Sequence, residues 1–290
     1  MSTPCAWHPL VAASIVAAGR AWPMRRGKNR FFSTLVLERP WQASFARLMP
    51  DIRTTAGFTL HGPAVDYTAD WIRVFGNHEV STERFIDAHG RPGSTMLDIG
   101  SNIGYFSFYA AQVRGLKSVA FEPNPKVLAY LRQTIASHHA EGRVEVVETA
   151  LGDCDGMARL IPDRTKSDLG GGHLESDPGG EIAVQRLDSL EAARGPFTDV
   201  SVVKIDVEGW ELPVLRGMAS FLARERPALA VEDLHENYGL AQRSAGDLEA
   251  ILGAYGYVED RSFRQFDQFP SNRFFTAPGP AGANGGRECR

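Results

Sequence analysis

The chain has 290 residues, of which 43% are hydrophobic and 23% charged, and its formal net charge is −4. This size suits one α/β domain with a modest accessory segment, and the composition provides enough apolar side chains for a core. The mildly acidic balance argues against a general nucleic-acid-binding protein, so we expect no nucleic-acid partner. The three cysteines lie far apart without metal-binding or redox-pair spacing, which favours a reducing, cytoplasmic location.

The N-terminal segment combines a short apolar run with basic residues. Residues 10–18 are too few to span a bilayer and follow no basic stretch, so we expect a buried helix and no stable membrane insertion. This helix could pack on its own core or on a second subunit, which leaves a homo-oligomer open. The first 37 residues contain no Asp or Glu, and residues 20–30 hold a basic cluster. We expect a solvated loop there, with a phosphate-bearing substrate or a membrane surface as alternative partners.

Residues 1–75 are predicted to form a lead-in that is mostly helical to about residue 50. Short β-like runs around Gly57 follow over residues 52–75. Strands and helices then alternate through a domain predicted over 76–277, in an order that requires a doubly wound, mainly parallel seven-stranded sheet with helices on both faces. The predicted strands are 96–99, 118–121, 144–147, 200–205 and 228–231, with 257–258 and 273–276 as a closing antiparallel pair, and the predicted helices are 105–113, 125–137, 212–224 and 245–255.

One segment interrupts this alternation. Residues 156–162 and 181–187 are predicted to form an antiparallel pair of strands. Between them, residues 165–180 are rich in Gly, Ser and Asp, and we interpret them as a lid-like insertion, because long loops are often functional. The tail, residues 278–290, is rich in Gly, Ala and Pro and is predicted to be disordered.

The strongest motif begins where the first strand of the domain ends, with Asp98 followed by a glycine-containing loop over 99–104. Small residues let the backbone approach a ligand, and doubly wound sheets bind ligands at the carboxyl ends of their strands. An acidic residue at this position disfavours the pyrophosphate of a dinucleotide. It favours a cofactor that carries an ammonium and a sulfonium, and S-adenosylmethionine carries both.

Two further motifs fit a nucleoside cofactor. Glu122 follows the second strand, where a carboxylate can accept hydrogen bonds from both ribose hydroxyls. Residues 150–153 follow the third strand, where an adenine edge would lie. The alternative is that Asp98 and Glu122 only cap helices. In the segment before the first strand, Glu79 could reach the cofactor's ammonium. The predicted cofactor-binding residues are Asp98, Gly100, Ser101, Asn102, Gly104, Tyr105, Phe106, Glu122, Pro123, Asn124, Ala150, Gly152, Asp153 and Glu79.

These motifs resemble the FkbM family of methyltransferases, in segments 97–107, 121–125, 150–153 and above all 204–217. The resemblance covers roughly residues 75–235. It implies the class I fold of S-adenosylmethionine enzymes and methylation of hydroxyl oxygens on sugars or polyketide-like natural products. Ser101 stands where the family usually has Ala, and Trp210 replaces a usually smaller residue. The first 50 residues and the loop 165–180 lie outside the resemblance, so they would determine the substrate.

Acidic side chains follow the fourth and fifth strands, at the edge where the methyl group would lie. Because an aliphatic hydroxyl is a weak nucleophile, its methylation needs a general base or a Lewis acid. Asp206, Glu232 and Asp233 could hold Mg²⁺, or His235 could act as the base. Glu208 is a third catalytic candidate beside Asp206 and His235, although it could simply favour the start of a helix, and Glu232 could instead bind backbone amides.

The sequence therefore predicts an S-adenosylmethionine-dependent O-methyltransferase of a small-molecule sugar or natural product. Two alternatives remain at this stage. One is an N-methyltransferase of a small amine or peptide, and the other is a methyltransferase-like binding module without catalytic activity.

Overall fold

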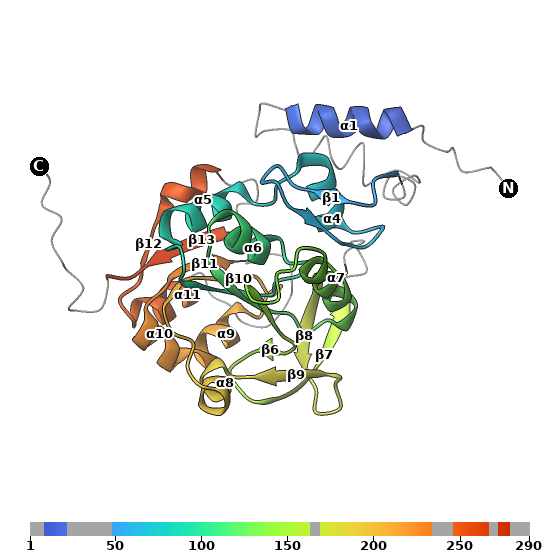
Figure 1. Cartoon of the computed structure of the whole chain (residues 1–290). Coiled ribbons are helices and arrows are strands. Elements are labelled where there is room, and N and C mark those ends of the chain that lie inside the picture. Colours follow the sequence, from blue (N-terminus) through green and yellow to red (C-terminus); the bar gives the residue numbers. More distant parts are fainter. Residues whose placement is uncertain (1–8, 22–47, 163–168, 234–245, 267–271, 279–290) are drawn as a thin grey trace, which may run out of the picture.

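The computed structural model describes residues 9–21, 48–162, 169–233, 246–266 and 272–278, and a seven-stranded sheet lies at its centre (Figure 1). The strand order is β12-β13-β11-β10-β3-β4-β5, and every adjacent pair is parallel except the two that involve β13. This confirms the predicted doubly wound sheet of the class I type. The strands are β3 (Thr95–Ile99), β4 (Lys117–Phe121), β5 (Val144–Val147), β10 (Val200–Ile205), β11 (Ala228–Glu232), β12 (Val258–Glu259) and β13 (Asn272–Thr276).

Helices cover both faces of this sheet, because side chains alternate between the two faces along each buried strand. In β3, Met96 packs into the cluster that includes Phe85, whereas Leu97 packs into the opposite cluster with Leu215. One layer holds α5 (Val80–His89), α6 (Tyr105–Phe108) with its π-helical continuation Tyr109–Val113, and α7 (Pro125–Ser137). The other holds α8 (Leu187–Arg194), α9 (Glu211–Gly217), α10 (Ala219–Glu225) and α11 (Asp247–Gly253), as Figure 1 shows.

Helix boundaries follow local signals in some places and depart from the predictions in others. The α7 helix occupies the predicted range because Pro125 suits its first turn and the Asn124 side chain caps it. The single helix predicted over 212–224 is instead two helices that meet at Met218. The predicted closing pair, β12 and β13, is present and antiparallel, and a 3₁₀ helix at Arg261–Phe266 follows β12.

The lead-in contains α1 (Pro9–Ala21), a hairpin of β1 (Ile52–Arg53) and β2 (Thr59–Leu60), and α4 (Tyr67–Phe75). The hairpin agrees with the predicted β-like runs, but residues 67–75 are helical, with Asp66 as the N-cap. The predicted burial of α1 holds for one face only. Val16 is buried, whereas Val11 is 46% exposed. None of the described helices is long and apolar enough to cross a membrane.

A second sheet of four strands, in the order β6-β9-β7-β8, lies beside the main sheet (Figure 1). The predicted antiparallel pair is present as β7 with β9, but the predicted lid-like loop is partly regular structure, because β8 pairs along β7. Residues 163–168 lie outside the described part. The strands of this second sheet are β6 (Ala150–Leu151), β7 (Gly156–Pro162), β8 (Gly172–Ser176) and β9 (Ile182–Gln185).

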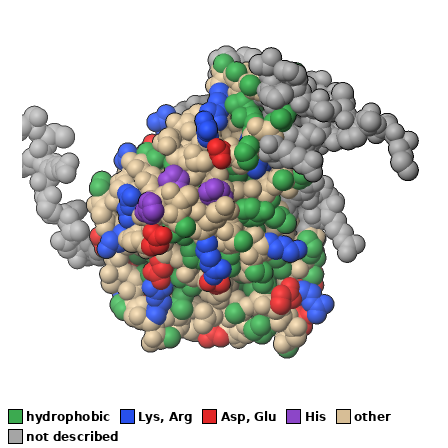
Figure 2. All heavy atoms as spheres, turned by 45° about the vertical axis from the view of Figure 1, so that its right-hand side comes forward, with side chains coloured by type: hydrophobic (Ala, Val, Ile, Leu, Met, Phe, Trp, Pro, Cys, Tyr) green, Lys and Arg blue, Asp and Glu red, His purple; other side chains and the backbone are tan. Residues whose placement is uncertain are grey.

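On the face that Figure 2 shows, basic and acidic side chains are intermingled rather than grouped in blocks of one charge.

Candidate active site

A cavity of about 520 Å³ lies at the carboxyl ends of the parallel strands, around the switch point between β3 and β10. The beginning of α4, the beginning of α5 and the β7–β8 hairpin complete its wall. This is the position at which doubly wound sheets bind ligands. The predicted cofactor residues that line the cavity are Glu79, Gly100, Ser101, Asn102, Tyr105, Phe106, Glu122, Pro123, Asn124 and Ala150.

The loop after β3 is shaped by the close approach of two backbones. Gly100 has φ +78°, and a Cβ atom built on it would lie 1.8 Å from the carbonyl oxygen of Asp206. The Asp206 N–H in turn donates to the Ile99 carbonyl over 3.0 Å. Only glycine fits between the ends of β3 and β10. Gly104, also at positive φ, does not line the cavity and instead packs beneath it, with a built Cβ 2.5 Å from the Leu131 side chain.

Asp98 lies under this loop rather than in the cavity wall. Its side chain is fully buried, and its Oδ2 accepts a hydrogen bond from the Ser107 hydroxyl over 2.6 Å. Burial raises the pKa of Asp98, although the nearby charge of Lys204 opposes that shift. Asp98 therefore lies behind the loop and near the charge of Lys204, and its role in cofactor binding, expected to act partly through the loop, stays a prediction.

Glu122 lies at the end of β4 with its carboxylate facing the cavity. Its Oε2 accepts from the Asn102 N–H over 2.9 Å and its Oε1 from the Asn124 N–H over 2.8 Å. Burial raises the pKa of Glu122 to about 7, against the opposing effect of these two hydrogen bonds. Since each carboxylate oxygen can accept a second hydrogen bond, the group can still receive two ribose hydroxyls. Asn124 caps α7, so the alternative in which Glu122 is the cap is wrong.

The wall next to β5 and β6 is mostly apolar. Thr149 and Leu151 line the cavity on either side of Ala150, whereas Gly152 and Asp153 do not reach it. The Asp153 side chain is exposed, with Arg216 at 3.9 Å, and its contact with the cofactor stays a prediction. The chain leaves the cavity wall after Leu151, and the Gly152 N–H donates to the Gln185 carbonyl beside the pairing of β6 with β9.

Lys204 is a site residue that the predictions missed. Its ammonium is buried at the end of β10, 2.8 Å from Asp206 Oδ2 and 5.1 Å from the centre of the Phe106 ring. Burial acts to lower the pKa of Lys204, but the charges of Asp206 and Asp98 outweigh it and raise that pKa. The side chain therefore stays cationic. A lysine inside a largely apolar buried strand was the available signal, because a buried cation requires anionic partners.

Asp206 and Glu232 meet at the cavity from adjacent strands, and their carboxyl groups share a hydrogen bond. For Asp206, burial acts to raise the pKa, but the neighbouring ammonium of Lys204 lowers it overall. For Glu232, burial and then the charge of Asp206 raise the pKa well above its ordinary value. Of the two carboxyl groups, Asp206 therefore ionises first, and Glu232 keeps its proton to higher pH.

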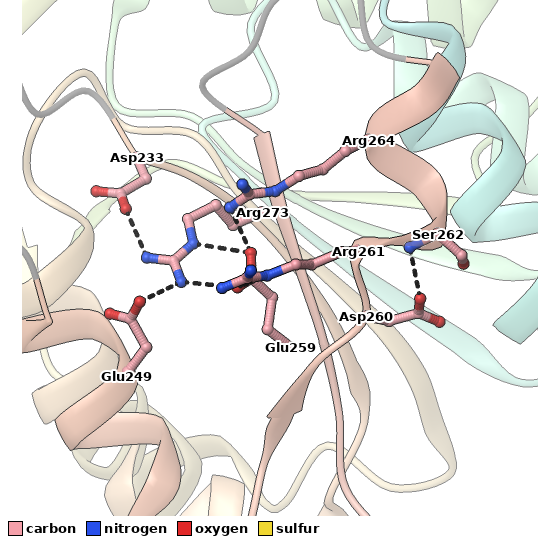
Figure 3. A network of polar contacts seen from close by, with 8 residues as sticks. All are labelled: Asp233, Glu249, Glu259, Asp260, Arg261, Ser262, Arg264 and Arg273. Carbon is pink, nitrogen blue, oxygen red and sulfur yellow. Dashed lines mark hydrogen bonds and ion pairs between the residues drawn. The ribbon is translucent and has the colours of Figure 1, made fainter.

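The predicted Mg²⁺ ligand set does not come together. Asp233 points away from the cavity towards Arg273, whose Nη1 lies 3.0 Å from its Oδ2 (Figure 3). Arg273 also holds Glu249 and Glu259, so it fixes the end of β11 against α11 and β12. Within the described ranges, no three or more His, Cys, Asp or Glu residues are grouped to hold a metal ion. His235 lies outside these ranges.

Glu79 and Glu208 complete the acidic part of the wall. Both line the cavity, and both have left-handed backbones, with φ of 44° and 52°. Asn102, at φ 50°, is a third such residue in the wall. Left-handed non-glycine residues cost energy and concentrate at functional sites. Next to Glu208, the side chain of Glu211 at the start of α9 accepts from the Gly209 N–H over 2.8 Å.

Comparison with known proteins agrees with this geometry. The model of the "Methyltransferase FkbM domain" family matches residues 98–259. The 31-O-demethyl-FK506 methyltransferase FkbM of Streptomyces tacrolimicus is 30% identical over 62% of this chain and 80% of its own length. The hexuronic acid methyltransferase AglP of Haloferax volcanii is 32% identical over 44% of this chain and 51% of its own length.

A solved structure is also similar. The crystal structure of methyltransferase FkbM from Methylobacillus flagellatus is 17% identical, with a TM-score of 0.40, and the match covers 81% of this chain and 60% of that one. The family match includes the glycine loop after β3, Glu122, the Lys204–Asp206 segment and Glu232, all of which contribute to the cavity wall. The chain therefore belongs to the FkbM family of S-adenosylmethionine-dependent methyltransferases.

Proposed function

We propose that this chain transfers the methyl group of S-adenosylmethionine to a hydroxyl oxygen of a sugar or natural-product small molecule. The cavity residues fit the cofactor. The glycine loop leaves room for its amino-acid part, Glu122 can receive its ribose, and the apolar wall around Ala150 suits its adenine. The remaining carboxylates, with Glu79 among them, suit its ammonium and sulfonium. When bound, the cofactor supplies an electrophilic methyl group on a positively charged sulfur.

The observation that carries the choice of a hydroxyl acceptor is the Asp206–Glu232 pair. A hydroxyl must lose its proton as its oxygen attacks the methyl carbon and the carbon–sulfur bond breaks. Glu232, once ionised, is a stronger base than an ordinary carboxylate because its pKa is raised. Lys204 keeps Asp206 ionised, and Asp206 accepts the hydrogen bond of protonated Glu232, so it holds that carboxyl group in place before it ionises. The hydroxyl proton passes to Glu232 in this proposal.

The relatives' names support an oxygen acceptor, since one is a 31-O-demethyl-FK506 methyltransferase and another a hexuronic acid methyltransferase. One observation favours a second candidate, the N-methylation of a small amine. Besides Glu122, four acidic side chains line the cavity and would attract a cationic acceptor, namely Glu79, Asp206, Glu208 and Glu232.

The first test is calorimetric titration of the purified chain with S-adenosylmethionine and S-adenosylhomocysteine. Glu122→Ala should weaken both by about tenfold or more, which corresponds to about 1.4 kcal/mol. Glu141→Ala, an exposed change away from the cavity, should leave both unchanged. If the folded wild type binds neither compound, the proposal is wrong and the binding-module alternative takes its place.

The second test identifies the acceptor atom. The chain is incubated with methyl-labelled cofactor and two matched panels, polyols and their amino analogues, and the products are analysed by mass spectrometry and NMR. Methyl ethers that Glu232→Gln no longer produces support the proposal. Methylamines that Glu232→Gln still produces would establish the N-methyltransferase alternative.

A further inference from the structure

Residues 169–172, which we name the strap, cross the wall of the cavity between the end of β7 and the start of β8. Gly170 and Gly172 line the cavity, and a Cβ atom built on Gly170 would lie 2.2 Å from the side-chain nitrogen of Asn102. The strap backbone therefore rests directly on the loop that follows β3. Three consecutive glycines, residues 170–172, give it little conformational preference of its own, so its position depends on contacts with neighbouring residues.

Two hydrogen bonds hold the first residue of the strap from opposite sides. The Leu169 N–H donates to Asp66 Oδ2 over 2.9 Å, and the Leu169 carbonyl accepts from Asn124 Nδ2 over 2.8 Å. The Asp66 side chain is completely buried. Removing one partner of a buried hydrogen bond leaves the other group unsatisfied, which costs free energy. Asp66 is thus a buried support of the strap that a single substitution can remove.

One support of the strap, Asn124, is joined to Glu122, the residue expected to receive the ribose, and the other, Asp66, begins a helix of the lead-in. The backbone N–H groups of Asn124 and Asn102 donate to the two oxygens of Glu122, while their side chains contact the strap. On the other side, Asp66 precedes Tyr67 and Thr68, which line the cavity from the first turn of α4. The strap is therefore fixed between the residues that would receive the ribose and a helix of the lead-in.

We propose that Asp66 is a positioning residue that holds the strap over the bound cofactor and so sets how long the cofactor stays bound. This inference rests on the proposed use of the cavity for S-adenosylmethionine. Asp66 lies outside the family match, which begins at residue 98. Its contribution comes from ordering the glycine strap before the cofactor arrives, so that binding does not bear that entropy cost.

Asp66 has two roles that substitutions can separate. Its Oδ1 accepts from the Ala69 N–H over 2.7 Å and caps α4, while its Oδ2 holds the strap. Asn and Ser are both good N-caps. In Asp66→Asn, an amide NH₂ replaces one acceptor oxygen. In Asp66→Ser, the side chain is too short for its hydroxyl to reach Leu169. Each variant can therefore keep the cap of α4 and lose the contact with the strap. Asp66→Ala loses both.

The experiment measures the dissociation rate and Kd of S-adenosylhomocysteine, together with the unfolding midpoint of the cofactor-free protein. We expect Asp66→Asn and Asp66→Ser to raise both the rate and the Kd about tenfold, with midpoints within about 2 °C of wild type. Hydrogen exchange at residues 169–172 should accelerate in both variants without cofactor. Asp66→Ala should show the same weaker binding and a lower midpoint.

Three outcomes would overturn the inference. The first is wild-type dissociation in Asp66→Asn and Asp66→Ser. The second is a loss of binding that follows the loss of thermal stability in proportion across the three variants, because that pattern belongs to a purely structural role. The third is a folded wild type that binds no S-adenosylhomocysteine, which would overturn the proposed function and this inference with it. The first two leave the proposed function intact.

Discussion

The raised pKa of Glu122 predicts that cofactor binding depends on pH around neutrality. Ribose hydroxyls donate hydrogen bonds, so they favour the ionised carboxylate over the protonated one. With a pKa of about 7 in the cofactor-free protein, Glu122 is ionised in roughly one molecule in ten at pH 6 and in roughly nine in ten at pH 8. If the ionised form alone binds, the affinity at pH 8 exceeds that at pH 6 by about tenfold.

The assay is calorimetric titration with S-adenosylhomocysteine across this range, in buffers of different ionisation enthalpy. At pH 7 the wild type should release about half a proton per cofactor bound, because half of its Glu122 side chains must ionise. Glu122→Gln has nearly the same shape and cannot ionise, so it should bind more weakly at pH 8 and lose the pH dependence. The control Glu141→Gln changes an exposed carboxylate and should retain it. The same slope in Glu122→Gln as in wild type would refute the reasoning.

The same pKa has a consequence for the stability of the cofactor-free protein. Between the unfolded value of 4.5 and the folded value of about 7, the native state holds a proton on Glu122 that the unfolded chain has lost. The stabilisation from this group is therefore fully present below pH 4.5 and is lost as pH rises to about 7, by up to about 3 kcal/mol. Glu122→Gln should remove that part of the pH dependence in denaturant melts.

Three further predictions test other parts of the site. Gly100→Ala should abolish cofactor binding and lower the free energy of unfolding by more than about 2 kcal/mol, because the new Cβ would collide with the Asp206 carbonyl. A variant with wild-type cofactor affinity in calorimetry and wild-type stability in denaturant unfolding would contradict this. Glu232→Gln should lower kcat by about 100-fold or more while cofactor affinity stays near wild type. The wild-type rate should rise with pH through a range above the ordinary carboxylate pKa, because the pKa of Glu232 is raised. A pH–rate profile in the variant that is unchanged from wild type would exclude Glu232 as the base. Arg273→Met should lower the free energy of unfolding in denaturant by about 3–5 kcal/mol, because it leaves Asp233 and its neighbouring carboxylates without their buried cation. A decrease in that free energy of less than about 1 kcal/mol would show that this network contributes little.

Local sequence patterns were enough to predict the main sheet. The parallel strands β3, β4, β10 and β11 are short, largely apolar runs that are mostly buried on both faces, so their pattern is visible without knowledge of their neighbours. The Pro125 helix and the Gly57 hairpin were predictable for the same reason, since one or two residues specify them. The class of cofactor also followed from local features, because Gly100 and Glu122 mark the ends of two strands that this fold places side by side.

The partners of the charged side chains were decided only by the tertiary structure. Asp206, Glu232 and Asp233 all follow strand ends, and nothing in their spacing shows that Asp233 turns to Arg273 while Lys204 occupies the place beside Asp206. The tie between Asp66 and Leu169 joins residues 103 positions apart. Such pairs are set by which strand ends and loops meet in space. The sequence therefore determined the sheet and its cofactor edge through local hydrophobic periodicity, whereas the protonation states and the fixed position of the strap depend on long-range burial and contact.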